Sequence, residues 1–227
     1  AKQLQNVKLF FLQEENSKIL LQKINNKNSV VVGDTRFDSV YENKLENKDH
    51  NLIKVFSKKR DTIIFGSIWS SDEHLFLKYI NQHKEYNFIL VPHELNNLQE
   101  LQNKTSGVFL SELHQQNNSN NILIIDQIGI LASIYKYAKI SYIGGGFGNG
   151  IHNILESLVF NIPVLFGPNY TKSNEAKDLI KLGVVKSVKN YSEFKDGINQ
   201  LKKVDKDVIQ NYIKRNVGAS EKILTYI

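Results

Sequence analysis

Residues 140–160 read ISYIGGGFGNGIHNILESLVF, with five glycines among the seven residues from Gly144 to Gly150. Ile140–Ile143 is interpreted as a buried strand of a parallel sheet, and Ile151–Phe160 has a helical pattern. Glycine tolerates positive φ and lets a ligand approach the backbone, and the start of a helix favours an anion. The segment therefore predicts a strand, a phosphate-binding turn and a helix. A flexible connecting turn is the simpler alternative.

Short apolar runs alternate with helical patterns from Asp61 to the end of the chain. The predicted strands cover 62–65, 88–91, 108–110, 122–125, 140–143, 164–166 and 184–186, and the predicted helices cover 72–83, 128–138, 151–160, 174–182, 192–203 and 205–224. This alternation predicts an α/β fold, a Rossmann-like parallel sheet with helices on both faces. Ser70 and Glu73 have the spacing of a capping box for the first of these helices. Ligands bind such sheets beyond the carboxyl ends of the strands.

The first sixty residues have a different pattern. A strand is predicted over 8–12, a helix over 14–24 and a strand over 30–32. We interpret residues 1–38 as the tail of a preceding domain and its crossover, and residues 39–227 as the Rossmann-like domain. The sequence contains no methionine, even at position 1, so we expect it to be a piece of a longer protein.

The composition is that of a soluble globular protein, with 41% hydrophobic and 23% charged residues in 227. No apolar run approaches the length of a membrane span and no signal peptide opens the chain, so we expect a cytoplasmic location. The absence of cysteine excludes disulfides and thiolate metal sites. The net charge of +6 favours anionic partners, although most lysines lie in mixed polar stretches typical of a solvated surface. No basic helix with interleaved aromatic residues is present, so nucleic acid is not an expected partner.

Small and polar residues follow several of the predicted strands. These residues are Gly66 and Ser67, His93 in the run Val91-Pro92-His93-Glu94, Asp126, the turn Gly144 to Gly146, and the loop residues Asn169, Lys172 and Asn174, which are candidate sugar contacts. On the helix after the glycines, Asn153 and Glu156 are three residues apart and share a face, and a carboxylate can accept two hydrogen bonds from a ribose diol. Structural alternatives remain: Asp126 as a helix N-cap, His93 as a solvated loop residue, and Glu156 as a partner of the helix dipole or of His152.

Several familiar site types do not fit the sequence. The glycine spacing is not G-x-G-x-x-G, Gly150 is followed by Ile151 instead of Lys-Ser/Thr, and the next strand ends in Phe166-Gly167-Pro168 without an acid. NAD and ATP are therefore disfavoured. His152 with Glu156 has no third metal ligand at a recognised spacing, so no metal is expected. No nucleophile elbow or serine–histidine–acid order is visible, which argues against a hydrolase.

Three motifs together resemble the donor-site signature of bacterial 3-deoxy-D-manno-octulosonic acid (Kdo) transferases. They are GGGF at 144–147, HNILES at 152–157 and IPVLFGP at 162–168. VGDTRFD at 32–38, Gly66-Ser67 with Glu73, VPHE at 91–94 and DQIG at 126–129 fall in the family's order, and Glu14-Glu15 with Ser17 is similar to its last N-domain helix. The resemblance covers nearly all of this chain but only the second half of the family's protein.

The resemblance implies the C-terminal, donor-binding half of a GT-B glycosyltransferase. The parent would move Kdo from CMP-Kdo to the lipid A precursor at the cytoplasmic face of the inner membrane, without a cofactor, using a glutamate in the missing N-terminal domain as base. Peripheral contact with the anionic membrane is implied as well. The isolated chain is expected to bind CMP weakly and to transfer nothing.

The resemblance also assigns roles within the donor site. Gly66, Ser67 and the turn Gly144–Gly146 would lie near the phosphate, His93 near the nucleotide, and Asn153 with Glu156 near the ribose; Pro92, Asp126, Phe147 and Ser157 belong to the same donor motifs. Some members carry Arg in place of His93 and some have fewer residues in the glycine turn, so this cradle differs from theirs. Two alternatives remain open: another GT-B enzyme or sugar-nucleotide epimerase that uses a UDP-sugar, and a non-catalytic nucleotide-binding module.

Overall fold

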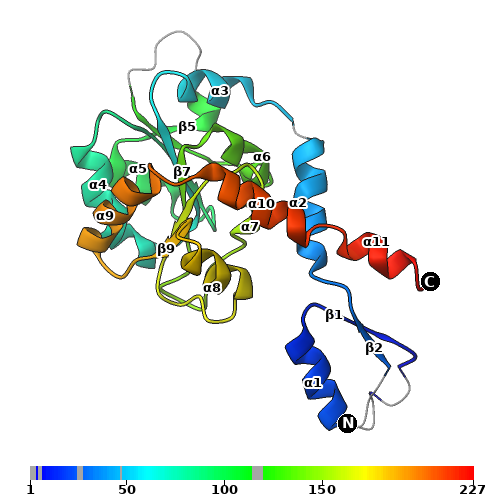
Figure 1. Ribbon diagram of the computed structural model, residues 1–227. Coiled ribbons are helices and arrows are strands. Elements are labelled where there is room, and N and C mark those ends of the chain that lie inside the picture. The colour runs from blue at the N-terminus through cyan, green and yellow to red at the C-terminus, as the bar shows by residue number, and fades with distance from the viewer. Residues whose placement is uncertain (1–3, 5–6, 25–27, 47, 114–119) are drawn as a thin grey trace. The chain divides into compact units, whose positions relative to one another are not determined.

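The computed structural model describes residues 4, 7–24, 28–46, 48–113 and 120–227. The chain forms two compact units (Figure 1). Unit 1 comprises residues 1–46 with 211–227, and unit 2 comprises residues 47–210. The predicted division at residue 38 stays a prediction.

Unit 2 is built on a seven-stranded parallel sheet with the order β5-β6-β4-β3-β7-β8-β9. The strands are β3 (Thr62–Ile68), β4 (Asn87–Pro92), β5 (Val108–Phe109), β6 (Ile122–Ile124), β7 (Ile140–Ile143), β8 (Val164–Phe166) and β9 (Val185–Ser187). The chain leaves β3 on one side towards β4 and later resumes on the other side with β7, so the strand order reverses between β3 and β7. This reversal is the position at which doubly wound sheets bind ligands. The predicted α/β Rossmann-like fold is confirmed.

Helices flank the sheet, and those predicted over 72–83, 174–182 and 192–203 begin and end near the predicted residues. They are α3 (Asn51–Ser57), α4 (Glu73–Gln82), α5 (Leu98–Thr105), α6 (Leu131–Ile134), α7 (Leu155–Leu158), α8 (Asn174–Lys181), α9 (Tyr191–Leu201) and α10 (Lys206–Asn216), with 3₁₀ turns η2 (Ser70–Asp72), η3 (Leu110–Glu112) and η4 (Tyr135–Tyr137). The helix predicted over 128–138 is shortened to α6 and η4. The helix predicted over 205–224 is interrupted, because Gly218 takes a φ of +109°.

The core of unit 2 lies on both faces of the sheet, as the successive apolar residues predict. On one face, α4, α5 and α9 pack Phe76, Leu101 and Phe194 into a cluster with alternate strand residues such as Phe65 and Tyr142. The intervening strand residues point to the other face because side chains alternate along a strand. That face also has fully buried side chains, among them Ile53 of α3, Tyr135 of η4 and Leu158 of α7.

The described part of unit 1 combines a two-stranded parallel sheet with α-helices, and residues 211–216 of α10 also belong to it. Its elements are β1 (Phe10–Leu12), α1 (Glu15–Lys23), β2 (Ser29–Val31), α2 (Thr35–Leu45) and α11 (Ala219–Leu224). Asp38 of α2 joins the two ends of the chain, since its carboxylate accepts the N–H groups of Gly218 at 2.5 Å and Ser220 at 2.6 Å. Burial opposes ionisation of Asp38, but these backbone donors outweigh it and lower its pKa.

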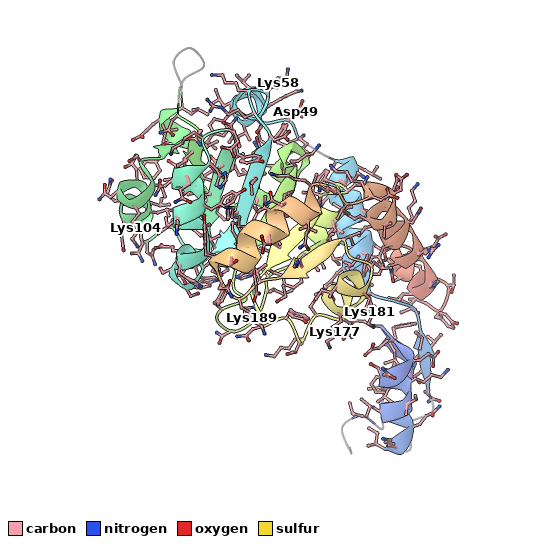
Figure 2. The ribbon with its side chains drawn as sticks, turned by 60° about the vertical axis from the view of Figure 1, so that its left-hand side comes forward. Asp49, Lys58, Lys104, Lys177, Lys181 and Lys189 are labelled. Atoms are coloured by element: carbon pink, nitrogen blue, oxygen red, sulfur yellow. The ribbon has the colours of Figure 1, made fainter. Side chains whose placement is uncertain are left out.

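The charged side chains of unit 2 lie mainly at the surface, as Figure 2 shows for Lys104, Lys177, Lys181 and Lys189. Lys104 pairs with Glu73 at 2.6 Å and Glu100 at 2.7 Å. Among the described helices, none is both long and apolar enough to cross a membrane.

Candidate functional site

A pocket of about 480 Å³ opens at the carboxyl ends of β3 and β7, where the strand order reverses. The loop after β3 contributes Trp69, Ser70 and Ser71, and the glycine loop after β7 contributes Gly145, Gly148, Asn149, Gly150 and His152. We call this cavity the glycine-loop pocket. Its place in the sheet is the one predicted for a ligand.

Glycines are required here because the backbones of the loops after β3, β7 and β8 lie so close together that no side chain fits between them. A Cβ atom on Gly144 would lie 2.2 Å from the carbonyl oxygen of Ser67, and one on Gly146 would lie 2.6 Å from the backbone of Gly167. Gly145 and Gly150 instead need positive φ, at +88° and +134°. The cluster therefore shapes the loop as well as opening it to a ligand.

Backbone N–H groups of this loop are the available anion donors. Among the described residues, those of Gly146, Phe147 and Asn149 have no hydrogen-bond partner. The N–H of Gly148 bonds to the carbonyl of Gly145 at 2.9 Å. Amides without partners at a concave backbone segment are typical of phosphate sites.

The prediction that a helix starts at Ile151 is wrong, because α7 begins at Leu155. The N–H of Ile151 bonds to Asn169, and that of His152 bonds to Gly144, which holds these residues against the neighbouring loops. The side chain of Asn153 accepts the N–H of Leu155 at 3.1 Å. The four residues 151–154 thus separate the glycines from the helix, so the pocket is lined by the glycine loop and not by the first turn of α7.

Asp72 is the fully buried carboxylate that holds the two sides of the pocket together. Its oxygens accept the hydroxyl of Tyr142 at 2.7 Å, the N–H of Trp69 at 2.8 Å and the N–H of Gly145 at 3.2 Å. Burial, and then the charge and hydrogen bond of Asp72, raise the pKa of Tyr142 far above its usual range. One amide of the glycine turn is therefore already occupied by the protein itself. Sequence analysis missed Asp72 because it resembles an ordinary acid in a first helical turn.

The segment before Asp72 departs from the predicted capping box. Glu73 pairs with Lys104, and Asp72 is the residue that accepts the backbone N–H three positions earlier. The pairing of β3 with β4 shifts register between Gly66 and Ile68, and Ser67 takes a φ of +51°. Such strained backbone is frequent at ligand sites. The bulge directs the chain after β3 into the wall of the pocket.

Three aromatic rings are layered at the pocket. The ring centroids of Trp69 and His93 are 4.3 Å apart, and those of His93 and His152 are 4.4 Å apart, both stacked. The indole Nε1–H of Trp69 donates to Nε2 of His152 at 3.0 Å. Burial lowers the pKa of His152, the nearby His93 lowers it further, and Asp72 opposes both. The net effect favours the neutral form of His152.

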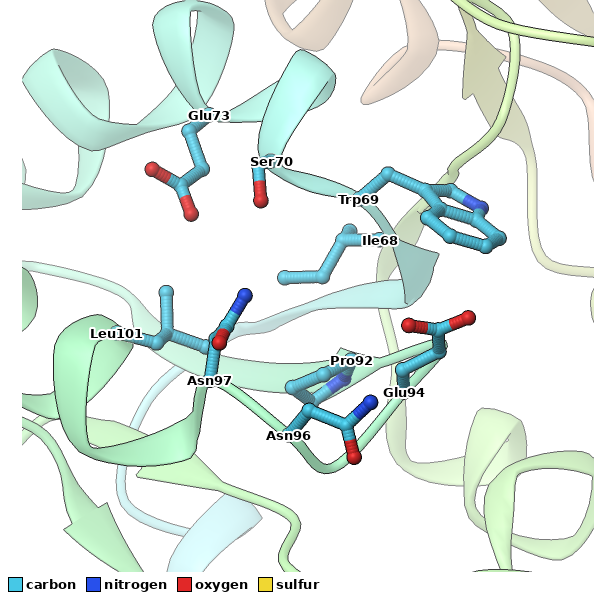
Figure 3. A pocket seen from close by; sticks show the side chains of 9 residues that line it. All are labelled: Ile68, Trp69, Ser70, Glu73, Pro92, Glu94, Asn96, Asn97 and Leu101. Atoms are coloured by element: carbon cyan, nitrogen blue, oxygen red, sulfur yellow. The ribbon is translucent and has the colours of Figure 1, made fainter.

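A second, smaller cavity of about 60 Å³ also adjoins Trp69 and is lined by residues of the loop after β4 (Figure 3). Its lining side chains are Ile68, Trp69, Ser70, Glu73, Pro92, Glu94, Asn96, Asn97 and Leu101. Pro92 thus lies beside the pocket wall. Figure 3 shows the carboxylate of Glu94 directed towards the indole of Trp69. Trp69 and Ser70 line both this cavity and the glycine-loop pocket.

The two proposed ribose contacts lie together. Asn153 and Glu156 are half-buried, and the amide of Asn153 approaches the carboxylate of Glu156 at 3.4 Å. Burial raises the pKa of Glu156. Ser157 by contrast is fully buried and its hydroxyl pairs with that of Ser141 at 2.7 Å, which places it in the core. Gly66 is also buried, since a Cβ there would overlap the hydroxyl of Tyr135.

The remaining predicted residues are distributed over neighbouring loops. Asn169 braces the glycine loop, because its side-chain amide donates to Gly148 at 2.8 Å. Lys172 and Asn174 are exposed at the start of α8. Asp126 accepts the N–H and the hydroxyl of Ser111, and α6 begins only at Leu131, so the N-cap interpretation of Asp126 is wrong. Within the described residues, no group of three or more His, Cys, Asp or Glu side chains is placed to hold a metal ion.

Comparison with known proteins identifies relatives of the sequence. The chain is 31% identical over 156 residues to 3-deoxy-D-manno-octulosonic acid transferase of Aquifex aeolicus, an alignment that covers 66% of this chain and 44% of that protein. The transferase of Rickettsia prowazekii is 29% identical over 152 residues, which cover 63% of this chain and 33% of that protein. The chain is a homologue of the Kdo transferases. It spans less than half the length of either relative. No protein-family model matches it.

Solved structures share the fold. The C-terminal CMP-Kdo binding domain of WaaA from Acinetobacter baumannii superposes with a TM-score of 0.57 at 19% identity, over 84% of this chain and 99% of that domain. MnaA of S. aureus, solved with UDP, superposes with a TM-score of 0.63 at 15% identity, over 96% of this chain and 59% of that one. These superpositions agree with the predicted α/β Rossmann-like fold.

Proposed function

We propose that this chain is the donor-binding domain of an inverting Kdo transferase and that its glycine-loop pocket holds the phosphate of CMP-Kdo. The observation that carries the proposal is the pocket at the β3–β7 reversal, which is lined by Gly145, Gly148, Asn149 and Gly150 of the glycine loop and in which the N–H of Asn149 has no hydrogen-bond partner among the described residues. The homology to Kdo transferases and the fold shared with a CMP-Kdo binding domain give the ligand class.

The geometry supports stabilisation of a departing phosphate. When the bond from the anomeric carbon to the phosphate breaks, negative charge grows on the phosphate oxygens. Fixed N–H dipoles directed at that charge lower the barrier without a metal ion. Asp72 holds Gly145 and Trp69 in place, so the donors need little reorganisation as the charge develops. Glu156 with Asn153 is the proposed ribose contact.

The acceptor and the catalytic base belong to the parent protein. In this proposal the parent transfers Kdo to the lipid A precursor at the cytoplasmic face of the inner membrane, and an N-terminal domain supplies the base across a cleft. Residues 1–38 would be the tail of that domain. Closure of the two halves would align the base, the acceptor hydroxyl and the anomeric carbon.

Calorimetric titration of the chain with CMP and with UDP tests the proposal. We expect weak saturable binding of CMP, weaker or no binding of UDP, and no Kdo transfer by the chain alone. Preference for UDP would favour a UDP-sugar enzyme of the same fold, as in the MnaA complex. Kdo transfer by the isolated chain would contradict the assignment of the base to another domain.

A further inference from the structure

The stack of Trp69, His93 and His152 constrains where protons can reside in the empty pocket. An indole N–H only donates hydrogen bonds, so Nε2 of His152 must carry a lone pair to accept it at 3.0 Å. Neutral imidazole with its proton on Nδ1 meets this requirement. The imidazolium form does not, since both of its nitrogens carry protons. The Trp69–His152 hydrogen bond therefore exists only while His152 is uncharged.

The groups that face His152 come from three elements. His93, in the loop after β4, stacks on its ring at 4.4 Å and disfavours a second positive charge. Asp72, in η2, favours the charge but directs its oxygens to Tyr142, Trp69 and Gly145. The glycine loop contributes backbone only, because a Cβ on Gly145 would lie 3.0 Å from the ring of His152. An anion in the pocket would thus be a new partner for a cationic His152.

We propose that an entering phosphate converts His152 from a hydrogen-bond acceptor into a cation, so that anion binding takes up one proton from solvent and releases the indole of Trp69. The proton goes to Nε2, which then donates to the anion. Charge-assisted hydrogen bonds are stronger than neutral ones, which offsets the loss of the indole bond. This inference rests on the proposed phosphate site and adds a proton to its binding equilibrium.

A dependence of affinity on pH follows from linkage. Burial and His93 lower the pKa of His152 in the empty pocket, and a bound anion raises it. Affinity for the anion therefore falls as pH rises between these two values and is constant below both. If the protonated pocket binds the anion about tenfold more tightly, saturation moves the titration midpoint upward by about one pH unit.

The chain contains one tryptophan, so its fluorescence reports this contact directly. We would titrate the full chain from pH 4 to 8, alone, with saturating sulfate and with saturating CMP. Sulfate is informative because its charge is constant over this range, whereas the second pKa of a phosphate monoester is near 6. A midpoint below 6.5 is expected for the empty chain, and each anion should move it upward.

Two variants and one control isolate His152. His152→Gln keeps a side-chain acceptor for the indole but cannot become cationic, and should abolish the midpoint and its shift. Trp69→Phe keeps the ring stack and removes the donor, and should raise the pKa of His152 measured by imidazole NMR. His83→Gln is the matched control, since His83 stacks on Tyr79 at 4.0 Å outside the pocket. It should leave the midpoint unchanged.

The outcomes separate this inference from the proposed function. A midpoint that sulfate and CMP leave unchanged, or a full shift in His152→Gln, overturns the proton-linked role of His152. A shift with sulfate but none with CMP supports His152 as the anion partner and contradicts the cytidine nucleotide assignment. If His152→Gln fails to fold, the NMR titration of Trp69→Phe decides, and an unchanged or lowered pKa of His152 overturns the inference.

Discussion

Replacement of Asp72 is expected to destabilise the chain strongly, because its carboxylate is the acceptor for three donors. In Asp72→Ala, the hydroxyl of Tyr142 and the N–H of Gly145 stay buried without an acceptor, and the N–H of Trp69 loses its partner in a half-buried position. Each buried unsatisfied donor costs about 1–3 kcal/mol, so the two buried donors together cost about 2–6 kcal/mol. That is a large share of the ~5–15 kcal/mol typical of a folded domain.

Asp72→Asn separates the hydrogen bonds from the charge. Its amide oxygen can accept both N–H groups while its NH₂ donates to the oxygen of Tyr142, whose hydroxyl hydrogen then rotates away. All three contacts persist without charge assistance, so a loss of only about 1–2 kcal/mol is expected.

Equilibrium urea unfolding followed by circular dichroism measures both changes. Asp178→Ala is the control, because Asp178 is exposed and its pair with Lys181 spans 3.4 Å; its cost should stay below ~0.5 kcal/mol. The reasoning is refuted if Asp72→Ala costs less than ~1 kcal/mol, or if Asp72→Asn costs as much as Asp72→Ala.

Three further predictions concern the pocket and the surface. Gly146→Ala should lower both stability and nucleotide affinity, since its Cβ would lie 2.6 Å from the backbone of Gly167. Gly148→Ala should be tolerated, because the atom nearest to its Cβ would be 3.6 Å away. Thermal melts and CMP titration of the two variants test the difference. Burial raises the pKa of Glu156 above 4.5, so its ionised form destabilises the fold at neutral pH and not below pH 4. Glu156→Gln should therefore be more stable than wild type at pH 7, equally stable near pH 4, and weaker in CMP binding; equal stability at pH 7 would contradict this. Lys104→Ala should change the free energy of unfolding by less than ~1 kcal/mol, measured in urea, because its ion pairs are at the surface.

The strands were predictable because buried parallel strands are apolar on successive residues, whereas the strand order and its reversal between β3 and β7 were not predicted. The runs at Ile140–Ile143 and Val164–Phe166 each begin and end where predicted. Three helices, α2, α3 and α5, were missed. Their sequences are rich in polar residues. Helices α3 and α5 each bury only two residues, among them Ile53 and Leu101, so their apolar residues do not repeat often enough to reveal a helical pattern.

The glycine turn was predictable, but its partners were not. The density of glycines indicated a ligand site because the backbone conformation that requires glycine is encoded within the turn itself. Asp72 and Trp69 contact this turn only through the pairing of β3 with β7, which no local pattern encodes. The helix start at Ile151 was predicted wrongly. The side-chain oxygen of Asn153 accepts the N–H of Leu155, and α7 begins only at that residue.

NMR titration of the isotope-labelled chain with CMP would locate the nucleotide directly. We predict saturable shifts at the glycine-loop pocket, namely at Trp69 to Ser71, at Gly145 to Gly150 and at His152, including the indole N–H of Trp69, and at the proposed ribose contacts Asn153 and Glu156. Saturating CMP that leaves these signals unchanged, or that perturbs a different set of residues instead, would contradict the assignment of this pocket to the donor phosphate.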